Sequence, residues 1–144
     1  MGFLSNLFGG NKEDKALRDL MAHINRILDD EKYQLELVHP SMRSMLESAP
    51  AYDKDPNGTG PFGFIETNPI PVNGPIGQLA YLSRLETQAG QRIMFHRLGA
   101  IGTVDVFEAV SFNGAEWFIL FVDFYHRRRS RLTPDGFGFT KDAA

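Results

Sequence analysis

Four arginines near the C-terminus, Arg127, Arg128, Arg129 and Arg131, form the most concentrated charge in the sequence. Clustered guanidinium groups can hold a phosphate or a carboxylate through paired hydrogen bonds. Because the run directly follows a predicted strand, its loop could form one wall of an anion-binding site. A simpler interpretation is a solvated loop whose charge is balanced by the acidic end of the first helix. The acidic residues there are Asp29, Asp30 and Glu31.

A hydroxyl, an imidazole and a carboxylate fall close together in the predicted strand register. A two-residue turn between the first two strands places Ser83 opposite His96. A five-residue connection over Gly99–Thr103 then places His96 opposite Val106, with Glu108 as a diagonal neighbour on the same face. Ser83, His96 and Glu108 together have the residue types of an activated nucleophile.

Three observations weaken the catalytic interpretation of this cluster. Ser83 falls inside a predicted strand instead of on a strained turn, no oxyanion donors can be named, and a one-residue slip in register disperses the group. The alternative is a polar cluster whose members satisfy one another, and Glu108 in particular needs a partner among its apolar neighbours. A metal site that adds His126, Asp105 and Asp123 has no compact ligand spacing, so we expect no metal and no cofactor.

Composition limits the function classes. With 144 residues, a formal charge of −3 and no cysteine, the chain reads as one domain without disulfides or thiolate sites. The mild negative charge argues against a specific nucleic-acid binder. The longest strongly apolar run, Trp117–Val122, is far shorter than the about 20 residues of a membrane span. With no visible signal peptide either, we expect a soluble, cytoplasmic protein.

A four-stranded antiparallel meander is predicted to position these side chains. Asn113-Gly114 is a strong signal for a type I′ hairpin turn. This turn pairs Val110 with Trp117, Glu108 with Ile119, and Val104 with Asp123. Apolar residues alternate regularly along the flanking segments, as in strands. The four predicted strands are Leu79–Thr87, Gln91–Leu98, Val104–Phe112 and Ala115–Tyr125.

Both faces of this predicted sheet are apolar. Val106, Val110 and Trp117 share one face, and Phe107 and Leu120 share the other. An antiparallel sheet that meets water normally has one polar face. We therefore expect a helical layer on one side, and a long loop or a second copy of the chain on the other.

The N-terminal part of the chain predicts helices over residues 12–48. Apolar residues spaced by three and four indicate an amphipathic helix that ends near Asp30 or Lys32 and covers one face of the sheet. A second, shorter helix begins at Pro40. Tyr33–Val38 fits either a helical continuation or a short strand. The apolar stripe of the first helix consists of Leu17, Leu20, Met21, Ile24, Ile27 and Leu28.

A Pro/Gly-rich loop over residues 49–78 separates the predicted helices from the sheet. Its second half, Pro61–Gln78, is apolar enough to lie across the sheet, with a turn at Asn73-Gly74 before the first meander strand. Beyond the basic run, Phe137 and Phe139 could add a fifth short strand or pack under the sheet. Residues 126–144 are otherwise a loop and a tail.

We expect residues 1–10 to be a flexible apolar peptide ahead of a single domain at 11–144. Phe3, Leu4, Leu7 and Phe8 share one side of a short helix, which could dock on a membrane surface. The polar side of this helix lacks the basic residues of an interfacial helix, so a frayed terminus is the better interpretation.

The sequence predicts an α+β fold, with one or two N-terminal helices packed on a four- to five-stranded antiparallel meander. The function it favours is a non-catalytic binding or assembly module, most simply a homodimer formed through a sheet face. The alternative is a small hydrolase or anion-binding enzyme. That enzyme would use His96 and Glu108 as acid and base, with the Arg127–Arg131 loop holding substrate charge.

Overall fold

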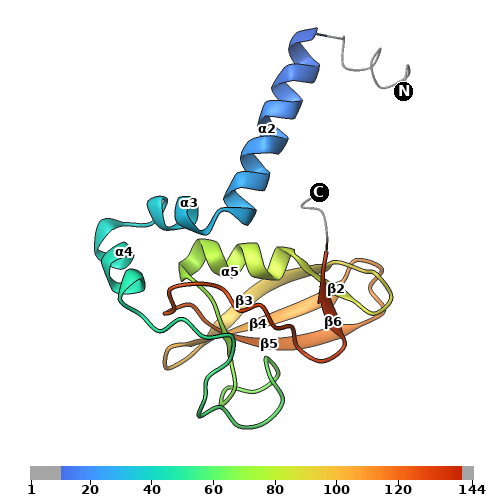
Figure 1. The fold of residues 1–144 in the computed structure, drawn as a ribbon. Helices are drawn as coiled ribbons and strands as arrows, with labels where there is room; N and C mark the ends of the chain where they lie inside the picture. Colours follow the sequence, from blue (N-terminus) through green and yellow to red (C-terminus); the bar gives the residue numbers. More distant parts are fainter. Residues whose placement is uncertain (1–10, 141–144) are drawn as a thin grey trace.

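The computed structural model describes residues 11–140 and has an α+β fold, as predicted (Figure 1). Within these residues, three helices precede a long loop that ends in a short strand, and a fourth helix then leads into the other five strands. The helices are α2 (Asn11–Asp29), α3 (Glu31–Glu36), α4 (Pro40–Glu47) and α5 (Gly74–Ser83). The strands are β1 (Ile70–Pro71), β2 (Leu85–Thr87), β3 (Ile93–Ile101), β4 (Val104–Ser111), β5 (Trp117–Asp123) and β6 (Phe137–Phe139).

The main sheet is mixed, whereas the sequence predicted a purely antiparallel one. Its strand order is β1-β5-β4-β3, with β3, β4 and β5 forming an antiparallel meander. The short β1 runs parallel to β5 and pairs Ile70 with Val122. The strand expected at Phe137–Phe139 exists as β6, but it pairs with β2 in a separate two-stranded sheet.

The predicted strand at Leu79–Thr87 is wrong over most of its length. Residues 74–83 form α5, and only Leu85–Thr87 is a strand. A short apolar run that is buried all round has no periodicity that separates a helix from a strand. Pro75 in the first helical turn fits the helix, and the Asn73-Gly74 turn, with Gly74 at φ 80°, precedes this helix instead of a strand.

The hairpin of β4 and β5 has the predicted register but a different turn. Val110 faces Trp117 and Glu108 faces Ile119, as expected. Gly114 has a positive φ of 74°, but Asn113 does not, so the turn is not type I′. The strands are instead joined by a four-residue loop, Phe112–Ala115, closed by a hydrogen bond from the Ser111 amide to the Glu116 carbonyl. The predicted two-residue turn and the observed four-residue loop are both centred between Asn113 and Gly114, so the pairing of the strands is unchanged.

The hairpin of β3 and β4 is tighter than predicted. β3 continues to Ile101, and a bulge between Arg97 and Gly99 shifts the register. His96 consequently faces Glu108 directly and not Val106. The shift is two residues, so the predicted face of His96 is preserved.

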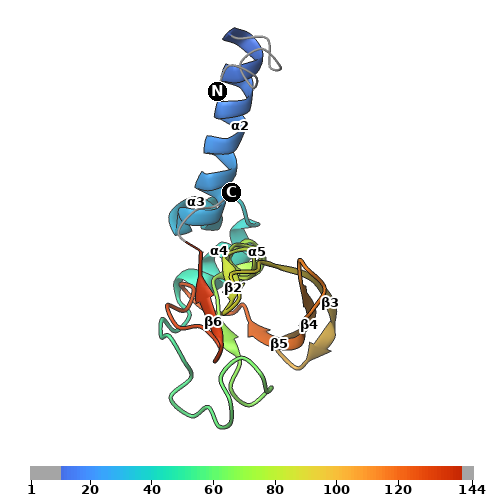
Figure 2. The ribbon, with the colours of Figure 1, turned by 90° about the vertical axis from the view of Figure 1, so that its right-hand side faces the viewer.

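One face of the meander forms the core. Helix α5 and the β2–β6 pair lie over this face (Figure 2). The fully buried side chains come from the sheet, from α5 and from the β1 segment that leads into it. They include Ile70, Val72, Tyr81, Leu82, Leu85, Leu120 and Val122.

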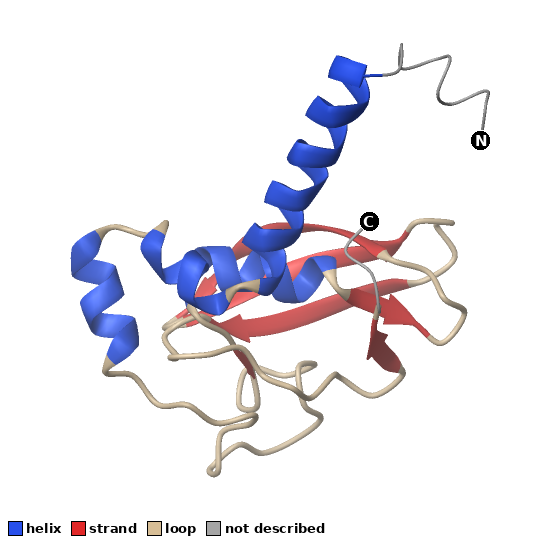
Figure 3. Cartoon of the chain, turned by 45° about the horizontal axis from the view of Figure 1, so that its top comes forward, coloured by secondary structure: helices blue, strands red, loops and turns tan. Residues whose placement is uncertain are grey.

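The opposite face is covered neither by the N-terminal amphipathic helix nor by the apolar loop Pro61–Gln78, the two covers predicted from the sequence. The apolar loop runs along the edge of β5, where the Gly63 carbonyl accepts a hydrogen bond of 2.9 Å from the Phe121 amide. Helix α2 projects away from the sheet, with only its C-terminal end near α5 (Figures 1 and 3). The buried Gln34 fixes that end, because its side-chain amide donates to the carbonyls of Ile27 and Leu28.

The segment after α2 is helical, which settles the open question at Tyr33–Val38. Asp30 caps α3 by accepting a 3.0 Å hydrogen bond from the Tyr33 amide. α4 begins at Pro40, as predicted. Among residues 11–140, no helix has the length and apolar character to cross a membrane. The N-terminal peptide with Phe3, Leu4, Leu7 and Phe8 lies outside the described residues.

Candidate functional site

The uncovered side of the meander, here called the open sheet face, carries several exposed apolar side chains. Met94, Ile101 and Trp117 are each at least half exposed on it. Partly exposed valine, isoleucine and phenylalanine side chains lie between them, and the polar members are His96, Glu108 and, at the end of β5, Asp123. The face consists of Met94, His96, Ile101, Val104, Val106, Glu108, Val110, Trp117, Ile119, Phe121 and Asp123.

Glu108 has its expected partners on this face. Its Oε2 accepts a 3.0 Å hydrogen bond from Trp117 Nε1, and its Oε1 lies 3.7 Å from His96 Nε2. The His96 side chain is 63% exposed. Ser83, by contrast, belongs to α5 on the core side of the sheet. The predicted neighbourhood of Ser83 and His96 is therefore wrong, and no hydroxyl nucleophile joins this pair.

The other acidic residues weighed as metal ligands have structural partners. Asp105 lies on the core face, where its carboxylate accepts hydrogen bonds from Arg97 at 3.1 Å and Gln78 at 3.0 Å. Asp105 and Glu108 therefore lie on opposite faces of the sheet, and Asp105 forms an ion pair with Arg97. Within the described part of the chain, no three histidine or carboxylate side chains converge to hold a metal ion.

The basic run is largely paired with acidic groups of the N-terminal part of the chain. Arg128 Nη1 contacts Asp53 Oδ1 at 2.6 Å, and Arg129 Nε lies 3.6 Å from Glu31 Oε1. The hydrogen bond from Arg128 lowers the pKa of Asp53, and the Arg131 backbone amide adds to this effect. The contact of Arg129 with Glu31 is one of the charge pairs that the simpler interpretation expects, while Arg127 is exposed.

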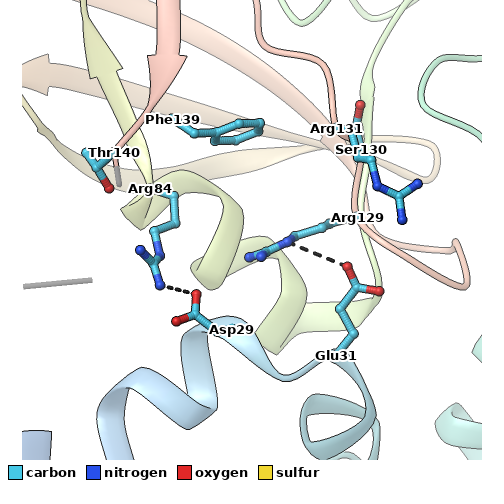
Figure 4. Close-up of a pocket in the computed structure, with 8 residues that line it drawn as sticks. All are labelled: Asp29, Glu31, Arg84, Arg129, Ser130, Arg131, Phe139 and Thr140. Carbon is cyan, nitrogen blue, oxygen red and sulfur yellow. Dashed lines mark hydrogen bonds and ion pairs between the residues drawn. The ribbon is translucent and has the colours of Figure 1, made fainter. Parts of the chain in front are cut away.

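Arg129 and Arg131 nevertheless line a pocket of about 370 Å³ together with Arg84, an arginine that the sequence did not single out (Figure 4). Arg84 follows the last turn of α5 and pairs with Asp29 at the end of α2. In the sequence, Arg84 could have been noticed as a charged residue that closely follows the apolar segment 76–82. The pocket is lined by Asp29, Glu31, Arg84, Arg129, Ser130, Arg131, Phe139 and Thr140.

A third polar cluster, also missed from the sequence, surrounds His126. Its Nε2 lies 3.1 Å from the Tyr52 hydroxyl, and its Nδ1 lies 3.1 Å from the Asp123 carbonyl oxygen. Burial, reinforced by the charges of Asp55 and Asp123, raises the pKa of Tyr52. Because His126 is almost fully buried and bonded through both ring nitrogens, it fastens the long loop to the end of β5.

Comparison with known proteins adds no assignment. No protein-family model matches the chain, and neither the curated proteins nor the solved structures include a significant match.

Proposed function

We propose that the protein is a non-catalytic assembly module that forms a homodimer. In this dimer, helix α2 of each copy lies on the open sheet face of the other. The observation that carries the proposal is the uncovered apolar face of β3, β4 and β5. Exposed apolar patches of this extent mark interaction sites, and a helix on a sheet face is a common way to bury one.

Helix α2 supplies a matching surface within the same chain. Along the projecting part, nothing among residues 11–140 covers its apolar stripe: Leu17 is 39% exposed, Leu20 54% and Ile24 37%. An isolated helix of this length is marginally stable in water, and packing of its apolar side normally stabilises it. Each copy therefore carries one apolar helix surface and one apolar sheet surface, and a two-fold pair can bury both.

The dimensions of the two surfaces agree. The 19 residues of α2 span about 28 Å, and the 8 residues of β4 span about 26 Å. The three-stranded face has a footprint of roughly 400 Å², and one side of the helix adds roughly 300 Å². Together these approach the about 800 Å² that each partner buries in a standard interface. The sheet face alone falls well short of that area.

The polar groups on the face are compatible with being covered. A carboxylate that loses water is costly unless it is hydrogen-bonded. Glu108 already accepts from the Trp117 indole and lies beside His96, so a helix can cover it without leaving it unpartnered.

The alternative, an enzyme with His96, Glu108 and the basic loop around one pocket, has less support. His96 and Glu108 lie on the open sheet face, whereas Arg129 and Arg131 line the pocket beside α5. No side chain of β3, β4 or β5 lines that pocket.

Light scattering over a concentration series tests the dimer, with one variant for each surface. Leu20→Glu charges the helix stripe, and Met94→Lys charges the sheet face. We expect the wild type to be dimeric. Each variant should have a dimer dissociation constant at least about tenfold higher than that of the wild type, because a buried unpaired charge costs several kcal/mol.

Matched controls use exposed positions outside both surfaces. Ala22→Glu adds the same charge on the opposite side of α2, and Gln88→Lys adds a charge in the turn before β3. Both controls should remain dimeric. A wild-type protein that stays monomeric at the highest concentration measured would contradict the proposal.

A further inference from the structure

Arg84, which lines the pocket beside α5, carries a buried polar atom that has no hydrogen-bond partner among the described residues. The Arg84 side chain is only 8% exposed, yet its Nε has no hydrogen-bond partner. The pairing with Asp29 occupies Nη2. An unsatisfied donor on a buried guanidinium is costly, since nearly all buried polar groups are hydrogen-bonded. An acceptor that enters the pocket would remove this cost.

The charges around the pocket favour an anion. Three guanidinium groups, from Arg84, Arg129 and Arg131, line it against the two carboxylates of Asp29 and Glu31. Arg129 extends toward Arg84 and Asp29 (Figure 4), and it is held in this direction by a 2.9 Å hydrogen bond to the Leu28 carbonyl. The site is thus pre-formed and carries one positive charge in excess.

The remaining wall is aromatic. Phe139 is 38% exposed and borders the pocket above the two guanidinium groups (Figure 4). Its ring packs edge-on against the buried Tyr81, with ring centroids 5.3 Å apart, so its position is fixed. A fixed ring beside an oxyanion site offers contact area to a flat apolar group attached to the anion. A volume of about 370 Å³ is sufficient for a small ligand of this kind.

We propose that this pocket binds a small organic oxyanion, namely a carboxylate or phosphate monoester carried on an aromatic ring. The oxyanion accepts from Arg84 Nε and from the Arg129 guanidinium, and the ring lies against Phe139. The pocket is on the α5 side of the sheet, away from the open sheet face. No residue of the open sheet face lines the pocket, so binding to the pocket can be tested apart from the sheet surface.

NMR titration of the full-length protein tests the proposal, because the Nε–H group of Arg84 can be observed directly. The probes are phenyl phosphate and benzoate, with inorganic phosphate as the anion without a ring and benzyl alcohol as the ring without a charge. We expect saturable shifts of the Arg84 Nε–H signal with phenyl phosphate, benzoate or both, and none with benzyl alcohol. The stronger of the two ring-bearing anions identifies the ligand class as phosphate or carboxylate.

Two variants and a control locate the site. Arg129→Gln should weaken binding of the preferred probe at least about tenfold, as expected for a charge-assisted hydrogen bond. Arg127→Gln removes a neighbouring exposed arginine that does not line the pocket and should leave affinity within about twofold. Because Arg129 also holds the end of α2, Phe139→Leu is a second variant, which should weaken phenyl phosphate but not inorganic phosphate.

Three results would overturn the proposal. The Arg84 signal could fail to shift with every anion, which would mean that the site does not bind oxyanions. Equal losses in Arg127→Gln and Arg129→Gln would show non-specific attraction to the basic loop. Equal affinity for inorganic phosphate and phenyl phosphate, unchanged by Phe139→Leu, would remove the aromatic part of the assignment.

Discussion

Asp53 is the residue that fastens the basic loop to the rest of the chain. Its Oδ1 accepts hydrogen bonds from Arg128 Nη1 at 2.6 Å and from the Arg131 amide at 2.9 Å. Its backbone carbonyl also accepts from the Ser130 hydroxyl. One residue of the long loop thus bonds Arg128, Ser130 and Arg131 of the segment that carries the predicted anion site.

The lowered pKa of Asp53 predicts a pH-dependent stability. A carboxyl whose pKa is lower in the folded state stabilises the fold above its unfolded pKa of about 3.9. This contribution is lost as the pH falls through the folded-state value. Asp53→Asn should therefore lower the free energy of unfolding at pH 7, and the difference from wild type should shrink at more acidic pH.

Urea denaturation at pH 7 and at about pH 3 measures this difference. Asp135→Asn, an exposed carboxyl in the turn before β6, is the matched control and should change stability little at either pH. If Asp53→Asn lowers the free energy of unfolding by the same amount at both pH values, the charge of Asp53 is not what holds the loop.

At the scale of elements, the start of α5 depends on close packing around one glycine. A Cβ atom at Gly77 would lie 2.1 Å from Asn73 Oδ1, closer than atoms can approach. The Asn73 side chain is fully buried and donates a 2.8 Å hydrogen bond to Gln34 Oε1. Gln34 in turn holds the end of α2, so this contact links α5 to the projecting helix.

Gly77→Ala should destabilise the fold although alanine is the better helix former. The propensity gain is about 1 kcal/mol, but Asn73 must move and its buried hydrogen bond to Gln34 is lost, which costs about 1–3 kcal/mol in addition to the clash. Gly99→Ala is the control, because a Cβ there meets nothing within 4 Å. The free energies of unfolding of both variants check this, and a Gly77→Ala protein as stable as Gly99→Ala would contradict it.

The elements that the sequence predicted well are those with a regular pattern. Alternation along β4 and β5 predicted two strands, the Asn113-Gly114 turn predicted their register, and the spacing of Leu20 and Ile24 predicted the amphipathic helix. The pattern could not give α5, because its apolar residues are buried on nearly every side. Because α5 was not predicted, Arg84 was not recognised as a candidate site residue. Its position in the pocket depends on this helix and on tertiary contacts with α2.

At the scale of the whole molecule, the described part of the chain leaves two apolar surfaces uncovered, the helix stripe and the open sheet face. The sequence already indicated that both faces of the sheet need a cover, and the structure covers one of them with α5 and the β2–β6 pair. The sequence also indicated the apolar stripe of α2, but we predicted that this stripe covers the sheet of its own chain. Because the end of α2 is fixed beside α5, this helix points away from its own open sheet face, which leaves it available to a second copy.

Mixing the two surface variants tests this arrangement most directly. Leu20→Glu retains an intact sheet face, and Met94→Lys retains an intact helix stripe. If the helix of one copy lies on the sheet of another, the mixture regains one of the two contacts that the wild-type dimer has. Light scattering should then show a one-to-one heterodimer at concentrations where each variant alone is monomeric. A mixture that stays monomeric while the wild type dimerises would show that helix meets helix and sheet meets sheet, and it would contradict the exchanged dimer.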